Sequence, residues 1–145
     1  MVSDEVILSE AIRLVNDGVA VTFPVNGRSM LPFIVGGSDS VILEKPTHSP
    51  KVGDVVLAEV EGGRHVVHRI VGIEAGLVSL MGDGNLMGRE HCREDQIKAK
   101  VSYVVSASGK KSSLDGFRSR LFAKIWFELL PFRRWLLAIY RRVFL

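Results

Sequence analysis

Between residues 19 and 107 the chain alternates short apolar runs, rich in β-branched residues, with turns built on glycine or proline. Runs of this length and composition favour strands, and their close spacing is typical of a compact all-β sheet or barrel. Strands are predicted at residues 19–25, 40–43, 55–60, 66–73, 77–80 and 97–106. The predicted fold class is therefore mainly β, with a compact sheet or barrel over residues 19–107.

Helical patterns flank this β region on both sides. At the N-terminus, Ser3 is placed to cap a helix whose first turn is acidic, and Gly18 is a natural stop for it. Residues 109–116 form a polar linker, after which helices are predicted at 117–130 and 132–145, separated by Pro131. We therefore expect a β domain over 1–108, a linker over 109–116 and a helical tail over 117–145.

The tail differs from the rest of the chain in charge and in aromatic content. Residues 1–116 carry 12 Lys/Arg and 15 Asp/Glu, whereas residues 117–145 carry 7 Lys/Arg, one acidic residue and 8 of the 11 aromatic residues. A nucleic-acid binder with a uniformly basic surface would not show this division. The composition indicates a near-neutral body followed by a basic, aromatic tail.

Cysteine content and the start of the chain bear on the compartment. The single cysteine, Cys92, allows no intramolecular disulfide, and the acidic start is unlike the basic start of a secretory signal. No uncharged apolar run approaches the ~20 residues needed to cross a bilayer. We expect a cytoplasmic chain that contacts the membrane peripherally from that side, with no metal and no cofactor.

The segment VNGRSMLP at residues 25–32 places Ser29 between a glycine-containing turn and a Met-x-Pro sequence. A serine on such a stiff, exposed corner has a fixed hydroxyl and an adjacent backbone N–H that could bind an oxyanion. The alternative is an ordinary turn serine without chemistry. Taken alone, the segment nominates Ser29 as a nucleophile without establishing it.

Two further segments carry polar residues within the predicted β region. VVHRIV at 66–71 places His68 in a β-branched run, where the alternative is a histidine of the core or edge with a satisfied hydrogen bond. His65 lies three positions earlier, on the other face of such a strand, and is the weaker candidate. MGDGN at 81–85 reads as a tight turn in which Asp83 and Asn85 bond to the local backbone.

Four motifs occur in a meaningful order: G-x-S-M-x-P, G-D-V-V, H-R-I-V and G-D-x-N. This set resembles the signal peptidase I / LexA superfamily of serine proteases, with a Ser/His pair as in the endoplasmic-reticulum and archaeal signal peptidases. The resemblance implies a coiled, mostly antiparallel β fold with Ser29 as nucleophile, His68 as general base and Asp83 as the acid near the site. Glu90 and Asp95 are alternatives for that acid. Histidine, with a pKa of ~6.5, suits a base that works near neutral pH.

The chain also departs from the pattern of that superfamily. A soluble-looking helix stands where signal peptidases carry a transmembrane anchor, and no DNA-binding helix-turn-helix of the LexA type precedes the β region. Gly27 occupies a position where bacterial members often carry a hydroxyl, and Arg28 is unusual beside the nucleophile. The substrate-binding residues implied by the motif are Gly27, Met30 and Pro32.

Two function classes follow from the resemblance and its departures. The first is a serine endopeptidase that cleaves an extended peptide or a precursor protein. The second is a catalytically weak or inactive member that serves as a peptide-binding or membrane-associated adaptor. A membrane-tethered scaffold with an inert β body is a third hypothesis.

The composition of the tail allows two interpretations. Its helices either pack an apolar face on the body or lie in a membrane interface, where aromatic and basic residues suit an anionic leaflet. Nucleic acid is not an expected partner, because binding it would leave the broad apolar surface of the tail exposed to water. The predicted membrane-binding residues are Trp126, Arg133, Arg134, Trp135, Arg141 and Arg142.

Overall fold

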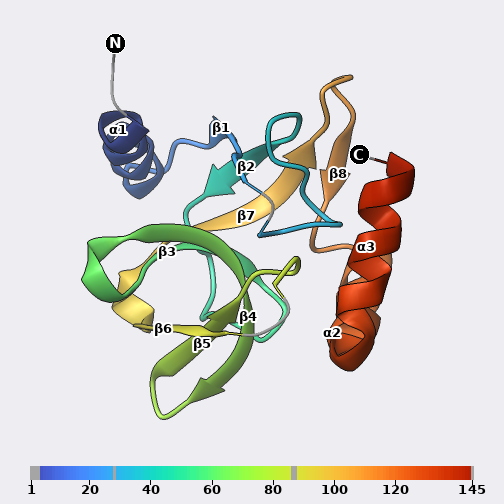
Figure 1. The fold of residues 1–145 in the computed structure, drawn as a ribbon. Helices are drawn as coiled ribbons and strands as arrows, with labels where there is room; N and C mark the ends of the chain where they lie inside the picture. The colour runs from blue at the N-terminus through green and yellow to red at the C-terminus, as the bar shows by residue number, and fades with distance from the viewer. Residues whose placement is uncertain (1–3, 28, 86–87, 145) are drawn as a thin grey trace.

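The computed structural model describes residues 4–27, 29–85 and 88–144. Figure 1 shows a strongly curved sheet with one helix, α1 (Asp4–Asn16), on one side and a helix pair on the other. The helix α1 ends where predicted, at Gly18, whose φ of +89° suits the glycine that terminates a helix. The predicted cap of this helix, Ser3, lies outside the described residues, as do Arg28 and Leu145.

The sheet is antiparallel throughout and confirms the mainly β fold class. Its strands run in the order β1-β2-β7-β3-β4-β5-β6, with β8 paired to β7, and form a half-barrel. Register shifts in the β2–β7, β3–β7 and β4–β5 pairs add local twist, which helps the sheet to coil. The strands are β1 (Val21–Pro24), β2 (Ser40–Glu44), β3 (Val55–Glu59), β4 (His65–Glu74), β5 (Leu77–Met81), β6 (Glu90–Arg93), β7 (Ile97–Val105) and β8 (Lys111–Ser113).

Each strand predicted from the alternation of apolar runs and turns is present, but two strands were missed. The β6 sequence EHCR lacks an alternating apolar pattern, and the KSS sequence of β8 is exposed at every position. Both strands are held by backbone pairing to a neighbour, which does not depend on apolar side chains. The segment 109–116, predicted as a polar linker, thus contains the short strand β8.

The core lies in two clusters on the coiled sheet. One joins α1 to β2, β3 and β7, with Val15, Val41 and Leu57 among its buried members. The other lies among β3, β4, β5 and β6 and includes Ile70 and Cys92. Cys92 is 3% exposed and packs as a small apolar side chain, as predicted, and burial raises the pKa of its thiol.

The helix pair consists of α2 (Phe117–Glu128) and α3 (Arg133–Phe144), joined by a 3₁₀ turn at Leu130–Phe132 that contains the predicted breaker Pro131. Two further 3₁₀ turns, Glu61–Gly63 and Glu94–Gln96, connect strands of the sheet. Within the described ranges, no helix has both the length and the apolar character needed to cross a bilayer.

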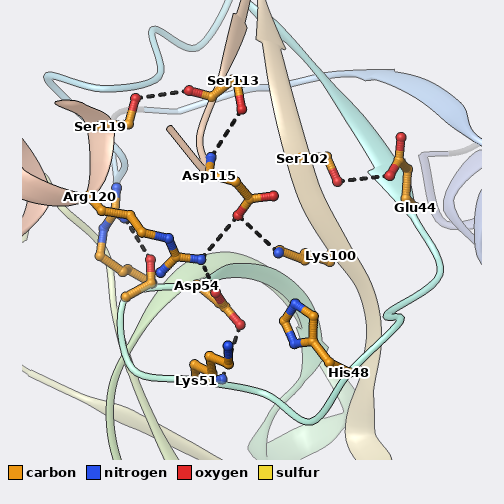
Figure 2. Close-up of polar contacts among 12 residues, drawn as sticks. Glu44, His48, Lys51, Asp54, Lys100, Ser102, Ser113, Asp115, Ser119 and Arg120 are labelled. Atoms are coloured by element: carbon orange, nitrogen blue, oxygen red, sulfur yellow. Dashed lines mark hydrogen bonds and ion pairs between the residues drawn. The ribbon is translucent and has the colours of Figure 1, made fainter. Parts of the chain in front are cut away.

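An ion-pair network fixes the first turn of α2 to the β body (Figure 2). Arg120 Nη2 binds Asp54 Oδ1 at 2.9 Å and Asp115 Oδ1 at 3.1 Å, and Lys100 Nζ lies 2.9 Å from the same Asp115 oxygen. Asp54 is 4% exposed and also accepts the Lys51 N–H. Burial raises the pKa of Asp115. The hydrogen bonds and positive charges of Lys100 and Arg120 lower it by more, so the pKa of Asp115 lies below its ordinary value. The aspartate of the G-D-V-V motif thus anchors the tail.

The face of α3 that contacts the body is not the aromatic face. Arg133 and Leu137, one turn apart, are the buried residues of this helix. Trp135, Ile139 and Val143 are instead 63%, 61% and 66% exposed. Of the two alternatives for the tail, packing of the apolar face on the body does not hold for these residues of α3, which are exposed to solvent.

Candidate active site

The turn that carries Ser29 is built by glycine and by a short helical turn after it. Gly27 has a φ of +87°, and Gly36 packs so closely on its backbone that a Cβ there would clash with the Gly27 carbonyl. The Met30 carbonyl accepts the N–H groups of Phe33 and Ile34, each at 3.0 Å. This local structure leaves Ser29 half-buried beside the core, and not on the exposed corner that was predicted.

The 82–85 turn packs directly behind Ser29. The Gly84 N–H donates to the Ser29 carbonyl at 2.7 Å, and the Asp83 N–H lies 3.5 Å from Met30 Sδ. Gly82 is in backbone contact with Ser29, because a Cβ at this glycine would clash with the Ser29 carbonyl oxygen. The G-D-x-N segment is thus a turn, as predicted, and it binds the backbone of the candidate nucleophile.

A groove of about 660 Å³ lies between β1 and the β3–β4 hairpin and is lined by both Ser29 and His68. The two residues come from segments 39 positions apart, and the coiled sheet brings them to one cavity. His65, expected on the opposite face of its strand, also lines the groove, which follows the hairpin along its length.

Only one of the predicted substrate-binding residues lines this groove. Met30 is among the described residues of its lining, whereas Gly27 and Pro32 are not. Met30 is itself only 2% exposed and belongs mainly to the core. Gly27 and Pro32 therefore lie outside the lining of the groove, and Gly27 instead supplies the positive φ of the turn before Ser29.

His68 is a nearly buried imidazole, 6% exposed, on β4. Its Nδ1 lies 3.3 Å from Glu90 Oε1, an ion-pair distance, but this atom makes no hydrogen bond to any described residue. Burial lowers the pKa of His68 below its ordinary value of 6.5, and the negative charges of Glu90 and Asp83 offset this effect only in part. The imidazole is therefore neutral at pH 7 and able to accept a proton.

Asp83 does not take the predicted position beside the imidazole. Its two carboxylate oxygens accept hydrogen bonds from Arg69 Nε and Nη2, both at 2.8 Å, in a bidentate pair that is almost fully buried. Arg69 also donates to the Gly53 carbonyl at 2.9 Å and lies over the Phe33 ring at 5.1 Å. Asp83 thus belongs to a structural ion pair that ties three motifs together.

Of the two alternative acids, Glu90 is the one near His68. The neighbouring strands β4, β5 and β6 bring it there, and its second oxygen binds Arg64 Nη2 at 2.7 Å. Asp95 pairs with Arg93 at the surface, where both side chains are about 70% exposed. Arg69 and Arg64 were not among the predicted site residues. The arginine of the H-R motif was the available signal for the first, and only the strand register could reveal the second.

The predicted membrane-binding residues of the tail fall into an exposed group and a group that faces the β body. Arg134, Trp135, Arg141 and Arg142 are exposed, as predicted. Trp126 is half-buried, and its Nε1–H donates to the Asp83 carbonyl at 2.6 Å. Arg133 is 2% exposed, donates to backbone carbonyls of the 82–85 turn, and has its pKa lowered by burial. Trp126 and Arg133 therefore face the β body, and their assignment to a lipid-facing surface is wrong.

Across the described part of the chain, no three His, Cys, Asp or Glu side chains gather as a metal site requires. No protein-family model and no curated protein matches the chain.

Proposed function

We propose that the chain is a serine endopeptidase in which Ser29 is the nucleophile and His68 the general base. One observation carries this proposal: both side chains line a single groove of about 660 Å³. The low pKa of the buried imidazole supports it, because a neutral His68 can take the hydroxyl proton at neutral pH. Glu90 Oε1, 3.3 Å from Nδ1, stabilises the imidazolium that forms.

The reaction proceeds by acyl transfer. Ser29 Oγ attacks the peptide carbonyl carbon while its proton passes to His68 Nε2, the ring nitrogen that does not face Glu90. The imidazolium then returns this proton to the leaving amine as the C–N bond breaks. A water molecule, deprotonated by the same histidine, hydrolyses the ester on Ser29 and regenerates the hydroxyl. The net reaction is hydrolysis of one peptide bond by one water molecule, and it regenerates both Ser29 and neutral His68.

The groove suits an extended peptide of precursor type. Among the described strands, β1 pairs only with β2, so its other edge is available to an added strand. Val25 donates its N–H to Asp39 on the β2 side, and alternation along the strand then directs the backbone of Thr22 away from β2. Apolar residues such as Phe23, Leu57 and Val67 line the groove and favour a substrate with apolar side chains.

Labelling with a fluorophosphonate probe tests the peptidase proposal. We expect one molecule of probe per chain, located on Ser29 by peptide mass spectrometry, because only a serine beside a base is activated toward phosphorus. Ser29→Ala should abolish labelling, whereas Ser108→Ala, at an exposed serine distant along the chain, should leave it unchanged.

A non-catalytic peptide-binding module is the second candidate function. It is favoured by the near-complete burial of His68 and by the missing hydrogen bond at Nδ1. Absence of labelling at Ser29, together with retention of peptides from an immobilised library, would establish this module and refute the peptidase.

We further propose that the helix pair rests peripherally on an anionic membrane surface at the cytoplasmic side. The helix pair leaves many large apolar side chains exposed to solvent, and several of its arginines are exposed as well. An apolar face with basic neighbours is the pattern by which an interfacial helix binds anionic lipid. The exposed apolar residues are Leu121, Phe122, Ile125, Phe132, Trp135, Ile139, Val143 and Phe144.

Sedimentation with vesicles of phosphatidylglycerol and phosphatidylcholine at low salt tests this surface. Changing Arg134, Arg141 and Arg142 together to glutamine should weaken binding about 100-fold, since each basic residue contributes about 1 kcal/mol near an anionic leaflet. The matched triple change of Lys45, Lys51 and Lys110 to glutamine removes the same charge elsewhere and should leave binding unchanged. Protein that stays in the supernatant at low salt would refute the membrane proposal.

A further inference from the structure

The backbone of Ser29 is held from behind by the 82–85 turn. Its carbonyl accepts the Gly84 N–H at 2.7 Å, and Gly82 touches the same carbonyl so closely that no side chain fits there. The adjacent Asp83 N–H lies against Met30 Sδ, the next residue after the nucleophile. A displacement of this turn therefore displaces the backbone that carries the hydroxyl.

The helix pair binds the opposite side of the same turn through two residues, Trp126 and Arg133, which we call the clamp. Trp126 Nε1–H donates to the Asp83 carbonyl at 2.6 Å. Arg133 Nη1 donates to the Asn85 carbonyl at 2.9 Å and reaches the Gly82 carbonyl at 3.5 Å. Three carbonyls of one short turn thus receive donors from a segment more than 40 positions later in the chain.

The clamp residues are also bound to each other and to the nucleophile segment. Arg133 Nη2 donates to the Trp126 carbonyl at 3.3 Å, and its guanidinium lies 5.1 Å from the centre of the indole. The Trp126 ring meets Phe33, four positions after Ser29, edge to face at 6.5 Å. The clamp is therefore a connected unit that touches both the 82–85 turn and the segment after the nucleophile.

The burial of Arg133 is unusual for a residue that merely attaches a helix. It is 2% exposed, and within the described ranges no carboxylate lies at ion-pair distance from it. Removing such a charge from water is unfavourable, and a leucine at this position would avoid that cost. The carbonyls of the 82–85 turn and of Trp126 are the compensation that the structure offers.

The other end of α2 is anchored independently. Arg120, six positions before Trp126, is bound to Asp54 and Asp115 in the network of Figure 2. The helix therefore spans between a fixed ion-pair network and the turn behind Ser29. Such a helix presents the clamp in one orientation rather than letting it swing with the tail.

We infer that Trp126 and Arg133 are positioning residues for Ser29, which hold the turn behind the nucleophile so that its hydroxyl points at the substrate carbonyl. This inference rests on the proposed peptidase function. It makes the basic tail a part of the catalytic apparatus in addition to its proposed contact with lipid. Because attack needs near-ideal geometry, a shift of about 1 Å can cost about 100-fold in rate.

The test uses the full chain with Trp126→Phe, which keeps the ring and loses only the N–H donor, and Arg133→Gln. Matched controls are Tyr140→Phe, which removes a hydroxyl from the same helix pair, and Arg118→Gln, which removes an exposed arginine from α2. The measurements are the fluorophosphonate labelling rate of Ser29, corrected for the folded fraction, and kcat and KM for a pool of quenched fluorescent peptides.

We expect both clamp variants to lower the labelling rate and kcat by about 10- to 100-fold with KM unchanged. The controls should match the wild-type protein, and Arg133→Lys should recover part of the rate, because an ammonium still donates to a carbonyl. Should Arg133→Gln fail to fold, Trp126→Phe alone decides the matter.

Three results would overturn the inference. If the wild-type protein labels at Ser29 and Trp126→Phe labels equally fast, the clamp has no positioning role, while the peptidase proposal stands. The clamp likewise has no positioning role if a clamp variant loses labelling only in proportion to its loss of folded protein. If the wild-type protein does not label at all, the proposed function fails and the clamp inference fails with it.

Discussion

Changing His68 to glutamine is expected to lower kcat/KM for quenched fluorescent peptides by about 10³-fold or more, because glutamine cannot act as the general base that takes the Ser29 proton. Glutamine approximates the size of the imidazole and fills its nearly buried position in β4. The fold should therefore persist, and far-ultraviolet circular dichroism with a thermal melt checks that it does. An active variant would exclude His68 as the base.

The pH dependence of the same reaction reports on the surroundings of His68. Since burial lowers the pKa of this imidazole, the acid limb of kcat/KM should fall below pH 6.5. Glu90 raises the pKa and Arg64 lowers it. Glu90→Gln should therefore move the acid limb to lower pH, and Arg64→Gln should move it to higher pH.

These two variants control for each other, because they sit in one ion pair and remove opposite charges. Measuring the histidine titration by nuclear magnetic resonance gives the same shifts without substrate. Shifts in the same direction for both variants, or an acid limb above pH 6.5 in the wild-type protein, would contradict the assignment of His68.

Changing Arg69 to methionine is expected to lower the free energy of unfolding by about 3–5 kcal/mol, the usual effect of breaking a buried ion pair from one side. Asp83, 4% exposed, would lose both of its hydrogen bonds from the guanidinium. The Gly53 carbonyl and the Phe33 ring would lose a partner as well. Urea denaturation followed by tryptophan fluorescence measures the change.

A matched surface pair shows what part of this loss is due to burial. Arg93→Met breaks the ion pair with Asp95, whose side chains are 70% and 73% exposed, and should cost no more than about 1 kcal/mol. The double change Arg69→Met with Asp83→Leu leaves no unpaired buried charge and should recover much of the stability. Equal losses for Arg69→Met and Arg93→Met would refute a structural role for the Arg69–Asp83 pair.

Local pattern was sufficient for much of the fold. Strands such as β3 and β4 combine β-branched residues with flanking turns, and these are properties of a few consecutive residues. The edge segments β6 and β8 were missed because they are polar, and only pairing with a neighbour makes them strands. Local signals also predicted the approximate ends of the helices, but they did not predict which face of α3 meets the body.

The candidate site shows the same division. Ser29 and His68 stand out within their own segments, one in a glycine turn and the other in an apolar run. The partner of Asp83 could not be read from its turn, because Arg69 reaches it only through the pairing of β4 with β5. Glu90 remained one of several acids until the order of strands placed it beside the imidazole.

By itself, the sequence determined most of the helices and strands and the separation of a near-neutral β body from a basic tail, and through the resemblance of four short motifs it nominated Ser29 and His68. Each of these depends on neighbouring residues, whose types and spacing are visible in the chain. Only the tertiary structure decided which carboxylate lies near His68 and which face of α3 meets the body. It also showed Trp126 and Arg133 bound to the turn behind Ser29. Contacts of this kind join residues far apart in sequence, and hydrogen-bond geometry rather than local pattern selects them.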